Sequence, residues 1–372
     1  MSRGEELRDG VSGADPPVLL DEWQLQPQVW DQVRRSVDRD VTPGRFLLTG
    51  SASPVDAPTH SGAGRIVRLR MRPMSLAERG IATPTVSLRD LLTGRHAALH
   101  GTTGVQLTTY TEEIVRSGFP GIRPLTDRPR RAQLAGYLDR IVERDFPEQG
   151  HLVRRPATLR AWLAAYAAAT ATTASYNAIL DAATAGDTDK PAKTTTMVYR
   201  DVLSQLWLLD PVEAWLPTRN RLSRLASAPK HHLADPALAA ALLGVGVTAL
   251  LDGTVKGHPR IRDGVLLGQL FESLVTLNVR VFAQAAEATV RHLRTRAGQH
   301  EIDLIVERGD HRIVAIEVKL TKRVVDQDVR HLRWLADQIG DELLDSVIVT
   351  AGPAAYRRPD GIAVVPAALL GP

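Results

Sequence analysis

The sequence contains no cysteine, and this absence limits its chemistry at once. Disulfides, cysteine nucleophiles and thiolate metal sites are all excluded. The longest apolar stretch, residues 237–251, is shorter than the roughly 18 residues that a membrane-spanning helix needs. The first ten residues carry acidic side chains where a secretory signal peptide has an apolar core. A cytoplasmic protein without a membrane partner is therefore expected.

Lysine is scarce, since the first in the chain is Lys190 and arginine supplies most of the positive charge. The 46 lysine and arginine residues outnumber the 42 aspartate and glutamate residues, which gives a net charge of +4 and a pI near 9.5. This small excess permits a nucleic-acid partner but does not require one. Hydrophobic residues at 44% and charged residues at 24% are typical of globular proteins, and a chain of 372 residues predicts about two or three domains.

Residues 1–78 predict a partial parallel sheet. A short apolar strand at 17–20 is followed by a helix at 27–39 and by a second apolar strand at 45–52. This is the order of a parallel βαβ unit. A third strand is expected at 65–71, where apolar and basic residues alternate.

Two acidic residues, Asp21 and Glu22, follow the first of these strands directly. An apolar strand that ends in adjacent acids is typical of a Walker B motif, in which the first acid holds Mg²⁺ and the second polarises the attacking water. The next strand ends in Thr49, Gly50 and Ser51, and ligands bind at the carboxyl ends of parallel strands. A strand that runs into a solvated acidic turn has the same pattern and is the alternative.

The phosphate-binding half of such a nucleotide site is absent from the sequence. A P-loop has the form G-x-x-x-x-G-K-[ST] and normally precedes the acidic strand by several dozen residues. Only 20 residues precede Asp21, and no lysine precedes Lys190. The sequence therefore predicts either a truncated start or a domain that has lost nucleotide binding.

Residues 110–255 predict a helical domain, which a polar linker at 79–109 joins to the N-terminal block. Helical periodicity of the apolar residues and alanine-rich composition predict helices at 131–146, 158–169, 175–184 and 194–206. The last two of these helices, followed by the β-like run LWLLDPVEAWL, are typical of a winged helix-turn-helix. Any helical hairpin followed by a strand would give the same pattern.

Residues 256–372 predict an α/β domain with a polar site. A helix that begins near Gly264 is followed by the two strands HEIDLIVE and RIVAIEVKL, by a second helix and by the strand SVIVTA. Asp303 lies in the first strand, and Glu317 and Lys319 lie in the second, where side chains alternate between the two faces. The short turn between the strands would bring the three side chains together, and Glu272 of the preceding helix would add a third carboxylate.

This spacing is the PD-(D/E)xK arrangement of metal-dependent nucleases. Glu272, Asp303 and Glu317 could hold Mg²⁺, while Lys319 could position or deprotonate the water that attacks a phosphodiester. A solvated hairpin face of mixed charge is the alternative. Phosphate contacts could come from the flanking arginines Arg291, Arg294, Arg296, Arg323, Arg330 and Arg333.

Nearly the whole chain resembles the bacterial and archaeal AAA-type ATP-binding proteins that carry an uncharacterised C-terminal domain. The resemblance rests on the order of the motifs LLDEWQ, FLLTGSA, RIVRLRMRPMSLAE, SGFPG, YLDRIVERD, APKHHLADPAL, LFESLV and EIDLIVE with AIEVK. It implies a P-loop ATPase domain, with Asp21 and Glu22 as Walker B acids and Thr49 to Ser51 as the sensor region. It also implies a winged-helix middle and a restriction-endonuclease-like C-terminal part. The missing Walker A loop is a departure from the family pattern.

The sequence as a whole thus predicts an α/β protein with a partial P-loop sheet, a winged-helix-like middle and a nuclease-like C-terminal domain. The first functional hypothesis is an ATP-binding, AAA-type protein without a Walker A loop that associates with DNA, with ATP and Mg²⁺ as cofactors. The second is a Mg²⁺-dependent nuclease that uses Asp303, Glu317 and Lys319. The third is a non-catalytic DNA-binding or interaction protein.

Overall fold

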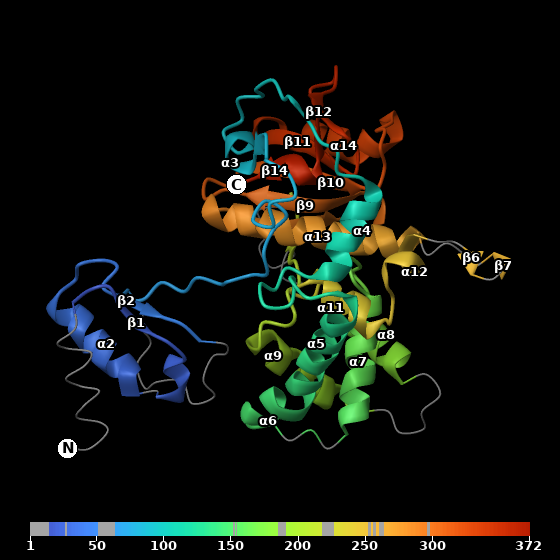
Figure 1. Cartoon of the computed structure of the whole chain (residues 1–372). Coiled ribbons are helices and arrows are strands. Elements are labelled where there is room, and N and C mark those ends of the chain that lie inside the picture. Colours follow the sequence, from blue (N-terminus) through green and yellow to red (C-terminus); the bar gives the residue numbers. More distant parts are fainter. Residues whose placement is uncertain are drawn as a thin grey trace, which may run out of the picture.

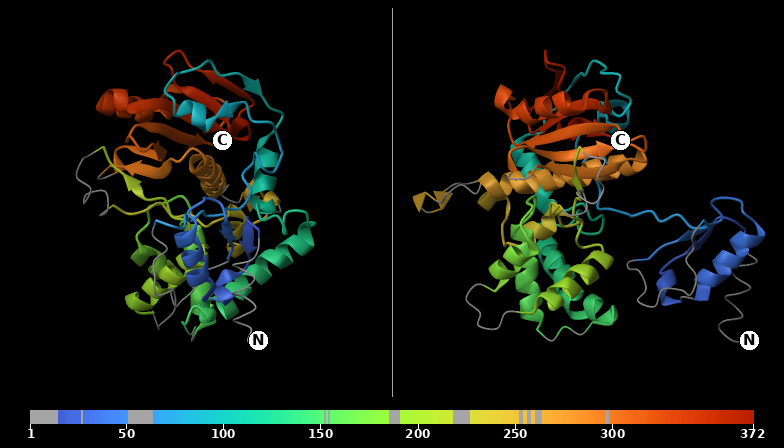
Figure 2. Two further views of the ribbon diagram at one scale, coloured as in Figure 1. Left: turned by 90° about the vertical axis from the view of Figure 1, so that its left-hand side faces the viewer. Right: turned by 180° about the vertical axis from the view of Figure 1, so that it is seen from behind.

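The structure is a computed structural model, and Figure 1 shows an N-terminal lobe, a helical region and a C-terminal α/β domain. The right-hand view of Figure 2 shows the N-terminal lobe standing apart from the other two parts. The described residues are 15–26, 28–50, 64–151, 153, 155–184, 191–217, 227–251, 254–255, 258–259, 264–295 and 298–372.

The N-terminal lobe is a βαβ unit, as the sequence predicts. Strands β1 (Val18–Leu20) and β2 (Phe46–Leu48) are parallel neighbours, and helix α2 (Gln28–Arg39) connects them after the short 3-10 helix η1 (Trp23–Leu25). Val29 and Val33 of α2 are buried against the apolar side chains of both strands, because the helix turns its apolar stripe towards the sheet.

The predicted third strand at 65–71 is wrong. All of these residues are described, and they form an extended segment that pairs with no strand. Val67, Leu69 and Met71 are exposed, while the alternate arginines Arg70 and Arg72 reach the rest of the protein. A segment in which apolar and polar residues alternate forms a β-strand only when a neighbouring strand pairs with it. Here the arginines instead form ion pairs with the carboxylate of Asp210.

The C-terminal domain is built on an eight-stranded mixed sheet of order β4-β12-β13-β11-β10-β9-β8-β5. Its centre is parallel from β13 through β11 to β10, and antiparallel from β10 through β9 to β8. The predicted strands around HEIDLIVE, RIVAIEVKL and SVIVTA are therefore confirmed. The strands of this sheet are β4 (Gly101–Thr102), β5 (Ala214–Trp215), β8 (Thr289–Arg294), β9 (Glu301–Glu307), β10 (Ile313–Lys319), β11 (Leu343–Thr350), β12 (Ala354–Arg357) and β13 (Ala363–Pro366).

One helix covers each face of this sheet. Helix α13 (Gly264–Ala285) contacts β8, β9 and β10 on one face, and α14 (Arg330–Ile339) contacts β9, β10 and β11 on the other (Figure 1). The side chains of β10 alternate between the two cores, since Val314 and Ile316 belong to the α13 side and Ile313 and Ala315 to the α14 side. The 3-10 helices η4 (Asp326–Val329), η5 (Gly340–Glu342) and η6 (Ala367–Leu369) complete this part.

Helix α13 is long and apolar enough to cross a membrane by its length and composition. The window Val265–Ala285 has a mean hydropathy of 1.4, but 61% of it is buried inside the protein. The sheet lies on one side of α13, and helices α4 and α11 contact it from another. Burial on several sides explains an apolar helix within a globular domain.

Residues 79–109, expected as a linker, contribute to the C-terminal domain. Strand β3 (Val86–Ser87) pairs with β14 (Leu370–Gly371), and β4 pairs with β12. Leu88 and Leu91 of helix α3 (Leu88–Leu91) are buried in the main core. The apolar residues of this segment are too few for a core of their own, so they pack against the chain's C-terminal end.

The helical region contains the helices that periodicity predicts. Helices α8 and α9 lie where the winged helix-turn-helix is expected, but the following strand β5 pairs in parallel with β8 of the large sheet. The winged-helix interpretation therefore stays a prediction. The helices of this region are α4 (Leu107–Arg116), α5 (Asp127–Arg140) with the π-helix η2 (Ile141–Asp145), α6 (Phe146–Glu148), α7 (Pro156–Ala168), α8 (Tyr176–Ala183), α9 (Lys193–Gln205), α11 (Pro236–Leu242) and α12 (Val247–Leu251); strands β6 (Thr254–Val255) and β7 (His258–Pro259) pair after them.

A buried carboxylate ties the extended segment to the other parts. Asp210, whose side chain is 6% exposed, accepts hydrogen bonds from Arg70 at 2.6 Å and from Arg72 at 3.0 Å, and Arg280 of α13 lies 2.7 Å from it. One carboxylate thus compensates the charge of guanidinium groups from two distant segments.

We expect Asp210→Asn to lower the free energy of unfolding by about 3 kcal/mol, because it removes the one negative charge that these buried arginines share. Urea denaturation measures the loss. Asp139→Asn is the matched control, since Asp139 forms an exposed ion pair with Arg160 and should cause no measurable change. Equal stability of Asp210→Asn and the wild type would contradict the role given to this network.

Candidate functional site

Asp21 and Thr49 meet at the carboxyl ends of β1 and β2, where the sequence places them. The hydroxyl of Thr49 donates a hydrogen bond of 2.5 Å to the carboxylate of Asp21. The backbone holds this contact, because the amide of Thr49 donates to Leu20 and the amide of Trp23 donates to Thr49. Asp21 is exposed, so its carboxylate is accessible to a ligand. Ser51, the other predicted sensor residue, lies outside the described residues.

Glu22 has a left-handed backbone conformation, with φ at 48°. Such a conformation costs a residue with a side chain about 1 kcal/mol or more, and residues held this way cluster at functional sites. Trp23, the next residue, stacks on Trp30 of α2 with ring centroids 4.9 Å apart. The turn that carries Asp21 and Glu22 is therefore held by the contact between Asp21 and Thr49 and by the stacking of Trp23 on Trp30. The catalytic role of Glu22 stays a prediction.

The second candidate site is a buried charged cluster between α13 and the sheet, with Lys230 at its centre. The Lys230 ammonium donates to Glu272 at 2.8 Å and to Asp303 at 2.9 Å, and Glu301 lies 3.3 Å away. The Lys230 side chain is 1% exposed. Its backbone pairs with Val212 through hydrogen bonds of 2.8 and 2.9 Å, which position the side chain under the sheet.

The predicted nuclease-like residues join this cluster. Strands β9 and β10 pair as far as Leu304 and Ile316, and beyond that pair the Asp303 carboxylate accepts the amide of Val318 at 2.9 Å. Lys319 lies 3.0 Å from Glu317, of which one carboxylate oxygen is buried without a partner. The structure thus brings the expected residues of β9, β10 and α13 together, and it adds a lysine that the expectation did not include.

Burial and the neighbouring charged groups shift the pKa values of the carboxyl groups in this cluster. Burial, followed by the charge of Asp303, raises the pKa of Glu272 to about 8. The same two causes raise the pKa of Glu317 well above its usual value. Burial alone would also raise the pKa of Asp303, but the ammonium groups of Lys230 and Lys319 outweigh it and lower that pKa to about 2. The ion pair between Asp303 and Lys230 is therefore fully charged at neutral pH.

The cluster does not fit a magnesium ion as it stands. Mg²⁺ requires oxygen ligands at about 2.1 Å in near-octahedral geometry. The Lys230 ammonium already contacts the oxygens of Glu272 and Asp303 that would have to supply two of them. In the described part of the chain, moreover, no group of three or more histidine, aspartate or glutamate side chains could hold a metal ion.

Sequence reasoning missed Lys230. Two signals could have led to Lys230: lysine is rare in this chain, and Lys230 lies with His231 and His232 just before the segment that leads into α11. A lysine at such a position is buried only when carboxylates compensate its charge. Its partners could not be named in advance, because they lie 42 and 73 residues away in sequence.

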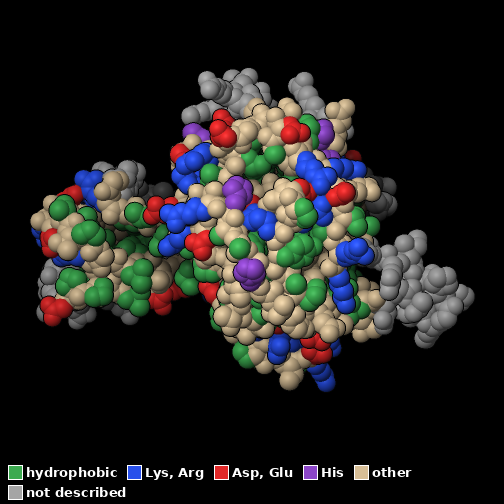
Figure 3. Space-filling model, turned by 90° about the horizontal axis from the view of Figure 1, so that it is seen from above, with side chains coloured by type: hydrophobic (Ala, Val, Ile, Leu, Met, Phe, Trp, Pro, Cys, Tyr) green, Lys and Arg blue, Asp and Glu red, His purple; other side chains and the backbone are tan. Residues whose placement is uncertain are grey.

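Three of the five described arginines that were expected to contact phosphate are paired with carboxylates, and Arg323 and Arg330 are the other two. Arg291 lies 3.3 Å from Glu307, and Arg294 lies 3.5 Å from Glu301. Arg333 contacts Asp360 at 2.5 Å. Figure 3 accordingly shows lysine and arginine side chains in separate groups, with acidic side chains beside several of them. DNA association stays a prediction, and Arg296 lies outside the described residues.

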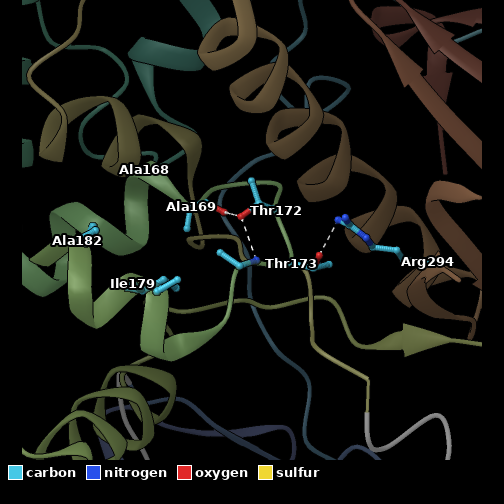
Figure 4. A pocket seen from close by; sticks show the side chains of 10 residues that line it. Ala168, Ala169, Thr172, Thr173, Ile179, Ala182 and Arg294 are labelled. Atoms are coloured by element: carbon cyan, nitrogen blue, oxygen red, sulfur yellow. Dashed lines mark hydrogen bonds between the residues drawn. The ribbon is translucent and has the colours of Figure 1, made fainter. Parts of the chain in front are cut away.

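An open pocket of about 480 Å³ lies near this cluster, between α7, α8 and the end of β8 (Figure 4). Alanine and threonine side chains line most of it, and Arg294 stands at its edge, where it donates to the hydroxyl of Thr173 at 2.8 Å. Arg294 also pairs with Glu301, a neighbour of Lys230. The lining carries no group suited to acid–base or nucleophilic chemistry among the described residues.

Comparison with protein families divides the chain into three parts. Residues 4–79 match the AAA domain family. The N-terminal part of the chain is therefore similar to AAA domains. Residues 107–249 match a domain of unknown function (DUF8612), and residues 267–370 match another domain of unknown function (DUF4143). These matches correspond broadly to the N-terminal lobe, the helical region and the C-terminal α/β domain, although β4 and β5 of the large sheet lie outside the third match.

Two mycobacterial proteins are similar to this chain over most of its length. It is 26% identical over 362 residues to an uncharacterised protein of Mycobacterium bovis and, equally, to one of Mycobacterium tuberculosis. The match covers 96% of this chain and 70% of each relative. No solved structure matches the chain.

Three buried histidines near the cluster predict sensitivity to acid. Burial lowers the pKa of His231, of His232 and, to about 4, of His292. These groups stay neutral in the folded protein, while in the unfolded chain they take up a proton below about pH 6.5. Their contribution to stability is therefore complete above pH 6.5 and is lost as the pH falls towards 4.

We expect the melting temperature to fall between pH 7 and pH 5, and His292 alone should account for about 2 kcal/mol at pH 5. His292→Gln should be less stable than the wild type at pH 7 but should lose less on acidification. His100→Gln, at an exposed histidine, is the control and should keep the wild-type slope. A wild-type melting temperature that does not change over this range would contradict the prediction.

Proposed function

We propose that this protein is an AAA-type, nucleotide-dependent protein whose N-terminal lobe supplies the magnesium side of a nucleotide pocket. The observation that carries the proposal is the contact between Asp21 and Thr49 at the carboxyl ends of two adjacent parallel strands. This is where open α/β sheets bind their ligands. The match of residues 4–79 to the AAA domain family supports the same function.

The donor set at this edge suits a hydrated magnesium ion bound to phosphates. A carboxylate and a hydroxyl are hard oxygen ligands, and both Asp21 and Thr49 belong to the rigid βαβ unit. The ion would neutralise charge on the phosphate groups of a bound nucleotide. In this proposal Asp21 would hold the hydrated ion, and the neighbouring Glu22 would serve as the proton acceptor for water wherever a phosphate-binding loop completes the pocket.

The 372 residues contain no G-x-x-x-x-G-K-[ST] loop to hold the phosphates. Backbone amides and a lysine normally supply most of the phosphate affinity. We therefore expect this chain by itself to bind Mg²⁺-ATP weakly, with a Kd of about 1 mM or above, and to show no ATP turnover.

The nuclease hypothesis is the second candidate, and the convergence of Asp303, Glu317 and Lys319 favours it. Lys230 disfavours it, because its ammonium takes the oxygens that a catalytic metal would need. A non-catalytic binding role of the C-terminal domain is consistent with both observations. We rank the nucleotide-dependent function first.

Equilibrium dialysis with labelled ATP tests the proposal. Binding to the wild type should be stronger with Mg²⁺ than with EDTA, and Asp21→Asn should remove this Mg²⁺-dependent part because the amide no longer attracts the ion. Asp40→Asn is the matched control, since Asp40 is an exposed carboxylate just beyond the C-terminal end of α2. Binding that is absent, or equal in Asp21→Asn and the wild type, would count against the magnesium-side assignment.

A further inference from the structure

We infer that Lys230 is the resident cation of the carboxylate cluster in the C-terminal domain, occupying the place where a nuclease-like site would hold a divalent metal. The inference begins with the contacts of a single nitrogen. The Lys230 ammonium has three N–H donors, and oxygens of Glu272, Asp303 and Glu301 lie 2.8, 2.9 and 3.3 Å from it. Two of these contacts are hydrogen bonds, to Glu272 and Asp303, and the third is an ion pair with Glu301.

The Lys230 ammonium cannot move aside easily. The backbone of Lys230 pairs with Val212 in both directions, and the next residue, His231, is held by the backbone of Thr172 at 2.9 Å and by that of Ala174 at 2.8 Å. The Lys230 side chain is 1% exposed. Displacing it would leave a buried charge without a partner, which costs several kcal/mol.

The buried Asp303 carboxylate, which is charged at neutral pH, explains why a cation is needed at this place. The carboxylates of Glu272, Glu301, Asp303 and Glu317 surround two ammonium groups, those of Lys230 and Lys319. Lys319 lies towards the surface beside Glu317, and its side chain is 35% exposed. Lys230 alone lies between Glu272 and Asp303, so it alone compensates the deepest part of the cluster.

Two consequences follow for divalent metals. The wild-type cluster should bind neither Mg²⁺ nor Mn²⁺, because the inner oxygens already contact a cation of their own. If the Lys230 charge is removed, the same oxygens become hard ligands around a vacated volume and should bind a divalent ion. This inference does not depend on the proposed nucleotide site, which lies in the N-terminal lobe.

Mn²⁺ binding, followed by electron paramagnetic resonance of the free ion, tests the inference in the full chain without nucleotide. Lys230→Met replaces the ammonium by an apolar group of similar length and should bind Mn²⁺ at least tenfold more tightly than the wild type. Lys319→Met is the matched control: it removes one positive charge from the same cluster but leaves the Lys230 ammonium in place. It should bind Mn²⁺ no more tightly than the wild type.

The possible outcomes separate the inference from its alternatives. A folded Lys230→Met that gains no Mn²⁺ affinity would overturn it, and so would equal gains in Lys230→Met and Lys319→Met. If Lys230→Met unfolds, recovery of its circular dichroism on addition of Mn²⁺ supports the inference, and no recovery counts against it. The wild type gives an independent test, because Mn²⁺ binding that Asp303→Asn abolishes would show that Lys230 does not exclude the metal.

Discussion

The contact of the Lys230 ammonium with Asp303 and Glu272 links the main parts of the protein. Lys230 lies in the helical region between α9 and α11, Glu272 lies on the central helix α13, and Asp303 lies on the strand β9. A buried cation that contacts carboxylates from separate elements restricts how these elements can pack, since any displacement leaves a charge without its partner. The paired strands and the apolar faces of α13 form around this constraint.

The N-terminal lobe has no comparable buried ion pair among its described residues. Its small core holds α2 against two strands, and its candidate site residues lie at an exposed edge. The extended segment that joins it to the other parts is anchored by arginines at Asp210. The N-terminal lobe and the C-terminal domain therefore carry two separate candidate sites, one at an exposed edge and one that contains a buried lysine.

Much of the fold could be predicted from local patterns. The βαβ unit, the helices of the middle region and the central strands of the C-terminal sheet all follow from periodicity and from strand-like runs. The prediction of a strand at 65–71 was wrong because apolar and basic residues alternate there as in a strand, although none of the described strands pairs with this segment. The role of 79–109 was missed because strands of two residues carry too little sequence signal, and their pairing partners lie near the C-terminus.

The candidate sites, like the fold, were predictable from the sequence only in part. The sequence by itself determined which carboxylates of β1, β9 and β10 lie at strand ends or on adjacent strands, because strand spacing and short turns are local properties. Only the tertiary structure decided what fills the C-terminal cluster. Lys230 reaches Asp303 across 73 residues of chain, through backbone pairing with Val212 and packing against α13. Contacts over such separations depend on how whole elements pack, which no local pattern encodes.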